Sequence, residues 1–417
     1  MTSTECVKLR ELKGRVPEID GLRGIAIGMV VMWHFFTETA QSRPGSGLAY
    51  LTRSLSLTWT GVDLFFVLSG FLIGGILVDT CDATNYFRAF YTRRFFRIVP
   101  IYAIVLLLFP AMHFLRHPAG PNIAAGAETS PPWYMYWTFT QNLWMAASSS
   151  LGTNSLDMSW SLAVEEQFYL TIPLVILLFR GRQLRKIVVA GILAAPLLRL
   201  VLYFVWHTKA GVAAYVLMPC RADGLLLGIL AASLLRDTAW KKRIQNANRF
   251  FIVAASILLA GVAYLASRAA TFSDPLMFTV GYTWMACFYV IVLVFAVTRP
   301  ETMVARALRV GWLRWLGSIA YGTYLLHQAV LRVVFRIFSV DPPRITSIRS
   351  LIIAIFAVAV TLTVAYLSWI YFEKPLVRIG HRTNYEFDRP SAVSPDLVTQ
   401  RSDGGETMKE AGATATT

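Results

Sequence analysis

Long hydrophobic stretches recur along this chain, each close to the ~20 residues that a helix needs to cross a bilayer. Their apolar residues surround the whole helix, which is typical of membrane segments and not of surface helices in soluble proteins. The pattern predicts an all-α, polytopic membrane helix bundle. Ten spans are predicted, at 19–38, 57–79, 96–115, 159–180, 186–206, 213–235, 250–267, 277–297, 315–338 and 350–372.

Two stretches do not fit this pattern. The segment 133–147 is short and aromatic, so we interpret it as an interfacial or re-entrant piece, because Trp and Tyr gather at headgroup depth. The end of the chain, 381–417, is rich in Ser, Thr, Gly, Asp and Glu, and we expect it to be a disordered tail. The predicted organisation is an N-terminal segment 1–17, one transmembrane domain 18–380, and this tail.

Positive charge is distributed unevenly between the two sides of these spans. Of 39 lysines and arginines, 27 fall in the segments that would face one side, including both termini, and seven in those facing the other. By the positive-inside rule both termini are predicted to be cytoplasmic, in a multi-pass protein of the cell inner (plasma) membrane. The net charge of +15 is therefore mostly a topology signal. We expect the lipid bilayer as a partner and no nucleic acid.

The first span, EIDGLRGIAIGMVVMWHFF, carries Arg23 and His34 on one face. They are eleven residues apart, which is three turns plus about 20° and roughly 16 Å along the axis. A cation and an imidazole inside a membrane helix need a polar interior instead of lipid. The alternative is that Arg23 reaches the headgroups and His34 only packs. Polar residues in the other spans favour a chemical role.

Three arginines open the third span, in the sequence YTRRFFR. Arg94 and Arg97 are at i, i+3, and Arg93 and Arg97 at i, i+4, so their guanidinium groups can converge. Guanidinium forks suit bidentate binding of phosphates. The alternative is that these arginines only set the membrane topology.

The fourth span opens with SWSLAVEEQFYL, which contains two adjacent carboxylates. Glu165 shares a helix face with Ser161 and Tyr169, so it is the carboxylate predicted to face inward. A carboxylate in the membrane costs about 2.5–3.5 kcal/mol, so a partner is expected. The predicted topology puts His34 at similar depth. A Glu165 carboxylate bonded to one imidazole nitrogen would leave the other nitrogen as a base.

Further polar residues lie inside the spans. Ser69 either contributes to a site or bonds its own backbone, and Arg221 and Asp223 pair with each other or with neighbours, in a purely structural role if not a functional one. For His327 a hydrogen-bonded structural role is favoured, and Glu373 is expected in a surface ion pair. The cysteines show no metal-ligand spacing, so no metal site is expected. The candidate pocket comprises Asp20, Asp63, Ser69, Trp160, Tyr169, Arg221, Asp223 and His327.

Taken together, these stretches resemble the acyltransferase 3 family of integral membrane O-acyltransferases, of the cell-envelope polysaccharide and macrolide type. Met158 departs from the family pattern, because many members have a histidine there, two residues before Trp160. The matching motifs occur in family order over residues 17 to about 378: DGLRG with His34, GVDLFFVLSGFL, the Arg93–Arg97 cluster, WSLAVEEQFYL, RADGLLLG, YGTYLLHQ and FEKP.

The resemblance implies an enzyme that moves an acyl group, usually acetyl, from cytoplasmic acyl-CoA to a hydroxyl of a cell-envelope or exported glycan. Acyl-CoA is then a co-substrate, and no bound cofactor is expected. The family's arginine–histidine pair corresponds to Arg23 and His34, its basic cluster to Arg94 and Arg97, and its motif glutamate to Glu165. We expect the arginines, Arg93 included, to hold the CoA phosphates. His34 would act as the general base and Glu165 would orient it.

Other functions are compatible with parts of this pattern. The acceptor could instead be a small molecule such as a macrolide. A transporter or flippase would use the same charged interior as a pathway, but the chain has no internal repeat and has a phosphate-suited cluster at one mouth only. A purely structural membrane scaffold leaves the buried His34 and Glu165 unexplained.

Overall fold

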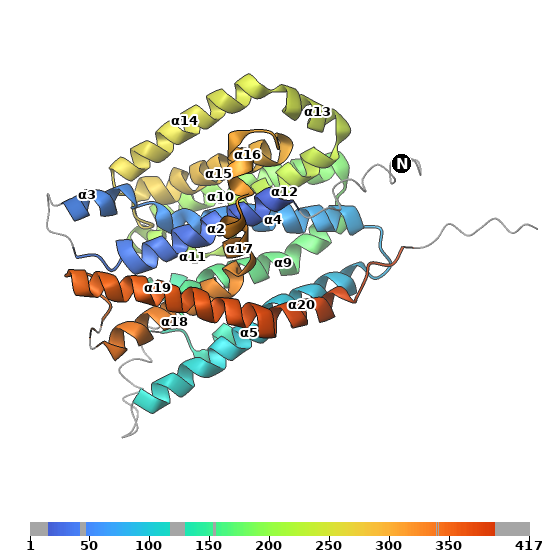
Figure 1. Cartoon of the computed structure of the whole chain (residues 1–417). Coiled ribbons are helices and arrows are strands. Elements are labelled where there is room, and N and C mark those ends of the chain that lie inside the picture. Colours follow the sequence, from blue (N-terminus) through green and yellow to red (C-terminus); the bar gives the residue numbers. More distant parts are fainter. Residues whose placement is uncertain are drawn as a thin grey trace, which may run out of the picture.

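The computed structural model describes residues 16–41, 47–116, 130–152, 156–338, 340 and 342–387, and these fold as a bundle of helices (Figure 1). In Figure 1, α2 and α4 run through the middle of the bundle, α14 lies along one flank, and α5, α19 and α20 lie along the other. The α-helices are α2 (Pro17–Met32), α3 (Gly47–Ser54), α4 (Gly61–Thr80), α5 (Tyr86–Arg116), α7 (Trp133–Trp137), α8 (Gln141–Ser148), α9 (Trp160–Leu178), α10 (Gly181–Trp206), α11 (Ala210–Val216), α12 (Met218–Arg236), α13 (Thr238–Asn246), α14 (Asn248–Ser267), α15 (Tyr282–Thr298), α16 (Met303–Leu308), α17 (Gly311–Ser318), α18 (Ala320–Ile337), α19 (Ile348–Ser368) and α20 (Lys374–His381).

Seven helical segments among the described residues are long and apolar enough to cross a membrane. The longest, Gly181–Arg236, contains two of the predicted spans, 186–206 and 213–235. The predicted spans 96–115 and 315–338 are also helical, within α5 and within α17 and α18. As expected, 133–147 forms only two short helices, α7 and α8. The all-α, multi-pass membrane bundle is confirmed, and the count of ten spans stays a prediction.

Polar contacts gather the segments predicted to face the cytoplasm at one end of the bundle, which we call the basic end. Both the start of α2 and the residues after α20 lie there, and the membrane side that this end faces stays a prediction. The contacts are Asp79–Arg236 (2.6 Å), Asp82–Arg180 (2.5 Å), Arg185–Asp237 (3.0 Å), Arg299 to the Ile244 carbonyl (2.8 Å), Glu18–Arg309 (3.5 Å) and Arg93 to the Thr383 carbonyl (3.0 Å).

Glycines bring α4 and α12 into close contact at the centre of the bundle. A Cβ added to Gly70 would collide with the Leu225 carbonyl, and one added to Gly228 would collide with the Val67 carbonyl. Small residues allow this backbone approach in membrane helices, where association depends on tight packing. The contact fixes the position of α4, which forms one wall of the cavity described next.

Candidate active site

A cavity of about 310 Å³ lies among α2, α4, α5, α9, α18, the end of α20 and the residues after it. Its α4 wall extends from Val62 to Ile76, which is about 21 Å at 1.5 Å per residue. Arginines line the part of the cavity near the basic end, and Ser161 and Tyr324 line the part towards the opposite end. The cavity is therefore elongated along the helix axes, with its cationic groups at one end.

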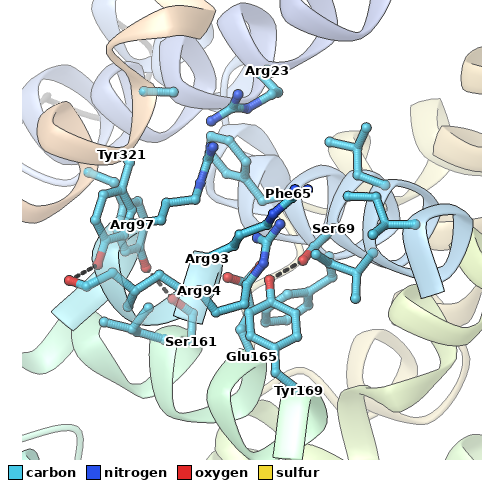
Figure 2. Close-up of a pocket in the computed structure, with 18 of the residues that line it drawn as sticks. Arg23, Phe65, Ser69, Arg93, Arg94, Arg97, Ser161, Glu165, Tyr169 and Tyr321 are labelled. Atoms are coloured by element: carbon cyan, nitrogen blue, oxygen red, sulfur yellow. Dashed lines mark hydrogen bonds between the residues drawn. The ribbon is translucent and has the colours of Figure 1, made fainter. Parts of the chain in front are cut away.

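Four arginines line this cavity: Arg23 from α2, and Arg93, Arg94 and Arg97 from α5. Figure 2 shows Arg23 and Arg97 extending towards one another across the cavity. Within the described part of the chain, none of the four forms an ion pair with a carboxylate, and the Nε of Arg94 is buried without a hydrogen-bond partner. Guanidinium groups held close together without ion-pair partners suit an anionic ligand.

Glu165 lies beside this cluster, on the face of α9 that the sequence predicted. It lines the cavity together with Ser161 and Tyr169, and the charges of Arg94 and Arg97 act on it. The guanidinium of Arg94 lies 5.7 Å from the centre of the Tyr169 ring. The charged groups that act on Glu165 are therefore those at the arginine end of the cavity.

Ser69 forms a hydrogen bond with the hydroxyl of Tyr169, joining α4 to α9 across the cavity (Figure 2). The alternative in which Ser69 bonds its own helix backbone is wrong. Both side chains line the cavity.

His34 lies in a π-helical segment, η2 (Trp33–Thr37), which continues α2 towards the opposite end of the bundle. Its Nδ1 is 2.9 Å from the Val30 carbonyl. A carbonyl only accepts, so Nδ1 carries the hydrogen and Nε2 keeps its lone pair. Nε2 lies 4.0 Å from the Glu38 carboxylate, which is 58% exposed. π-Helical turns are frequent at functional sites.

The expected hydrogen bond between Glu165 and His34 is not formed in the described structure. The backbone carbonyl of Val30 fixes the His34 tautomer instead. The physical reason is that Glu165 and His34 lie at different depths along the axis of the bundle. Ser161, one turn before Glu165, already lies level with Tyr324, and His34 lies beyond Tyr324 towards the opposite end. The orienting role predicted for Glu165 is therefore replaced by a backbone contact.

His327 joins His34 to the cavity through Tyr324. The His34 and His327 rings meet edge-on, with centres 4.8 Å apart, and the Tyr324 ring lies 5.7 Å from His327. The Tyr324 hydroxyl hydrogen-bonds Ser161 Oγ at 2.5 Å and the Met158 carbonyl at 2.9 Å. The His327 Nδ1 donates to the Tyr324 carbonyl, 2.6 Å away. The cavity thus ends at Tyr324, and neither histidine is among its lining residues.

Asp63, Arg221 and Asp223 belong to a separate, fully buried network, so their placement in the pocket is wrong. Arg221 pairs with Asp63 at 2.5 Å, and Asp223 pairs with Arg199 at 3.0 Å. The Arg221 guanidinium lies 3.8 Å from the centre of the Tyr282 ring. The two ion pairs explain how four charges are tolerated inside the membrane region. They join α4 to α12 and α10 to α12.

The other predicted pocket residues also lie outside the cavity lining. Trp160 is buried against Tyr215, with ring centres 4.2 Å apart, and Asp20 is buried near Arg23, on which its charge acts. Glu373 is 5% exposed and accepts a hydrogen bond from Ser368 at 3.0 Å, so the predicted surface ion pair is wrong. The last span continues to His381 and packs on α5, which buries this carboxylate.

Sequence reasoning missed four polar side chains that line the cavity: Tyr321, Tyr324, His381 and Tyr385. The two α18 tyrosines could have been found, because they and His327 follow one another at intervals of three residues and so share a helix face. His381 and Tyr385 had been assigned to the tail, but residues 381–387 have a defined structure. The rest of that predicted tail lies outside the described residues.

Comparison with known proteins identifies the family to which this chain belongs. A family model described as an acyltransferase domain matches residues 16–370. The chain belongs to the acyltransferase 3 family. This confirms the resemblance drawn from the motifs. The matched acyltransferase domain includes the four cavity arginines and both paired histidines, whereas His381 and Tyr385 lie beyond its end.

Curated relatives of this acyltransferase-family chain include three named O-acetyltransferases. The peptidoglycan O-acetyltransferase OatA of Listeria monocytogenes is 26% identical over 384 residues, which is 88% of this chain and 56% of the relative. The putative peptidoglycan O-acetyltransferase YrhL of Bacillus subtilis is 26% identical with the same coverage, and the O-acetyltransferase OatA of Staphylococcus aureus is 25% identical over 88% and 58%. The chain thus spans just over half the length of these relatives. No solved structure matches it.

Proposed function

We propose that this chain is a membrane O-acetyltransferase that takes an acetyl group from cytoplasmic acyl-CoA and delivers it to a hydroxyl of a cell-envelope glycan. The observation that carries the proposal is the elongated cavity, which has at one end four arginines that form no ion pair with any described carboxylate. Its other end stops at Tyr324, next to the paired histidines. The peptidoglycan O-acetyltransferases among the relatives support a cell-wall glycan as acceptor.

The arginine end is suited to the nucleotide half of acyl-CoA. That half carries the donor's phosphates, and bidentate arginine–phosphate contacts are strong and directional. The pantetheine arm is mostly uncharged, and the α4 wall of the cavity from Phe65 to Ile76 carries a single polar side chain, Ser69. Bound in this way, the thioester points towards Tyr324 and away from the basic end.

His34 supplies the base in this proposal. Its Nε2 lone pair removes the proton of the acceptor hydroxyl as the oxygen attacks the thioester carbon. The new C–O bond forms, the C–S bond breaks, and the proton held on Nε2 passes to the leaving CoA sulfur. The Val30 carbonyl holds the tautomer that this transfer requires. Atoms and charge balance without a cofactor.

Tyr324 separates the cavity from the histidines, so the proposed transfer requires this side chain to move. Two hydrogen bonds hold it, to Ser161 Oγ and to the Met158 carbonyl. Ser161 lies in the first turn of α9, and Met158 lies in the short turn just before that helix. Rotation of the Tyr324 ring would open the cavity to His327 and His34.

Glu165 takes a different role from the one first predicted. It stands beside Arg94 and Arg97 and near the Ser69–Tyr169 hydrogen bond. We assign it to positioning Arg94 for the donor phosphates. Loss of the Glu165 carboxylate should then weaken donor binding more than it slows the chemical step.

The proposal is tested with purified protein in lipid nanodiscs, acetyl-labelled acetyl-CoA, and soluble peptidoglycan fragments as acceptor. We expect CoA release together with label in a base-labile ester on the glycan. A crude envelope extract serves as a second acceptor mixture and identifies another acceptor if one is used. If folded protein releases no CoA with either acceptor, the proposal is wrong. Substrate flux into proteoliposomes without CoA release would favour a transporter.

A further inference from the structure

The segment after α20 folds back over the basic end of the cavity and is held there on both sides. Arg93 Nε donates to the Thr383 carbonyl at 3.0 Å, and Asn85 Nδ2 donates to the Asn384 carbonyl at 2.8 Å. The Thr84 amide donates to the Glu386 carbonyl at 2.9 Å. These contacts fix residues 383–386 against the start of α5.

Tyr385 lies between those anchors, and its side chain lines the cavity. The Arg93 guanidinium lies 4.8 Å from the centre of its ring, an arrangement that restrains the ring. The Tyr385 hydroxyl is buried and has no hydrogen-bond partner in the described part of the chain. The neighbouring Thr80 hydroxyl gives its own hydrogen to the Ile76 carbonyl at 2.7 Å. Its oxygen could still accept from Tyr385 and acts on the phenol, but no hydrogen bond between the two is formed in this structure.

A buried hydroxyl without a partner lowers stability, so its presence next to a cluster of arginines calls for an explanation. A phenol can donate one hydrogen bond and can accept others. Burial raises the pKa of the Tyr385 phenol, so the group stays a hydrogen donor at physiological pH. The ligand that it would complete is therefore an acceptor of hydrogen bonds, and the arginines make that ligand an anion.

We propose that the Tyr385 hydroxyl donates a hydrogen bond to a phosphate oxygen in the nucleotide part of acyl-CoA, and so sets the enzyme's preference for the full donor over a truncated one. This inference rests on the proposed function. It places a donor-recognition residue in the segment that follows the matched family domain, which ends at residue 370. The rest of the nucleotide contact comes from the cavity arginines.

The test compares the wild type with Tyr385→Phe, which removes only the hydroxyl and keeps the ring over Arg93. Two donors are used: acetyl-CoA, which has the nucleotide, and S-acetyl-pantetheine, which lacks it. We expect Tyr385→Phe to raise the KM for acetyl-CoA about tenfold, the lower limit for a hydrogen bond to a charged group. Its kcat, and its KM for S-acetyl-pantetheine, should stay within about twofold of the wild type.

Tyr371→Phe is the matched control, because Tyr371 is 77% exposed and lies near the same end of the chain. It should change neither KM. A second measurement is inhibition by adenosine 3′,5′-bisphosphate, the nucleotide part alone, whose inhibition constant should rise about tenfold in Tyr385→Phe. An unchanged KM for acetyl-CoA overturns the inference, and so does an equal rise for both donors.

Failure of the proposed function and failure of the Tyr385 contact give different results in this experiment. If the wild type does not turn over acetyl-CoA, the proposed function fails and the Tyr385 contact fails with it. If the wild type is active and Tyr385→Phe matches it with both donors, only the Tyr385 contact is wrong.

Discussion

Replacement of Asp63 by alanine should strongly destabilise the protein, because it leaves the Arg221 charge buried and unpaired. The two side chains are 5% and 1% exposed, and a single contact of 2.5 Å joins them. The Nε and Nη1 of Arg221 have no other hydrogen-bond partner among the described residues. The neighbouring carboxylate, Asp223, is already paired with Arg199.

The expected cost follows from this burial. Removal of one partner of a buried ion pair costs about 3–5 kcal/mol, whereas a solvent-exposed pair contributes about 0–1 kcal/mol. The Tyr282 ring under Arg221 offsets part of the loss, so we expect about 3 kcal/mol for Asp63→Ala. Glu301→Ala is the control, because the Glu301–Arg306 pair is exposed on both sides and 4.0 Å long.

The assay is reversible unfolding in detergent micelles, which gives the free energy of unfolding of each variant. The double variant Asp63→Leu with Arg221→Met should recover to within about 1 kcal/mol of the wild type, since apolar residues can replace a buried pair at little cost. A loss below 1 kcal/mol for Asp63→Ala would refute the reasoning. So would a double variant no more stable than the single one.

The same double variant separates a structural from a functional role for this pair. Neither Asp63 nor Arg221 lines the cavity, so the folded double variant should keep its KM for acetyl-CoA within about twofold. A large rise in KM would return both residues to the binding site that the sequence first suggested.

Three further predictions follow from the structure. Arg94→Ala should raise the KM for acetyl-CoA at least about tenfold in steady-state assays, because it removes a charge-assisted phosphate contact. The control, Arg306→Ala at an exposed arginine, should leave this KM unchanged. A fall in kcat alone would count against phosphate binding by Arg94. Gly70→Val should abolish assembly of folded protein on size-exclusion chromatography, since its side chain would collide with the α12 backbone; a normal elution profile would contradict this packing. Asp237 caps α13 and pairs with Arg185, and although burial opposes it, the Trp240 amide and Arg185 lower the Asp237 pKa. The stabilisation that the Asp237 carboxylate contributes is therefore present above the ordinary carboxyl pKa and lost as the pH falls through the lowered value. In thermal unfolding, Asp237→Ala should cost about 1 kcal/mol at pH 7 and less near pH 3. An equal cost at the two pH values would argue against the linkage.

Much of the fold follows from local sequence pattern. Uniform hydrophobicity and the distribution of arginines are enough to predict the helices and the end of the bundle where the loops meet. The inward face of α9 was also predictable, because Ser161, Glu165 and Tyr169 repeat every four residues. These features depend on a helix's own periodicity or on its charge, which a single sequence records directly.

Relative depth between helices was not predictable from periodicity. Glu165 and His34 lie on inward faces, but the sequence does not fix how far α9 is shifted along α2. The π-helical turn around His34 also holds more residues than an α-helical turn, so a count of 100° per residue fails there. Arg221 paired with Asp63 instead of Asp223, because residues at i, i+2 on a helix point to different faces.

The C-terminal boundary of the site was hidden for a different reason. Tyr385 lies in a polar stretch whose composition resembles that of the tail after it, and its order comes from long-range contacts with Asn85 and Arg93. Contacts between residues about 300 positions apart leave no local trace in a single sequence.

The central claim is that His34 is the base for acetyl transfer, and the most direct measurement is the turnover of acetyl-CoA by His34→Gln beside the wild type. Glutamine keeps a polar side chain of similar size but cannot act as the base. The account predicts a variant that folds, keeps its KM for acetyl-CoA, and loses about 10²–10⁴-fold in kcat. A folded His34→Gln that retains more than a few per cent of wild-type turnover would contradict it.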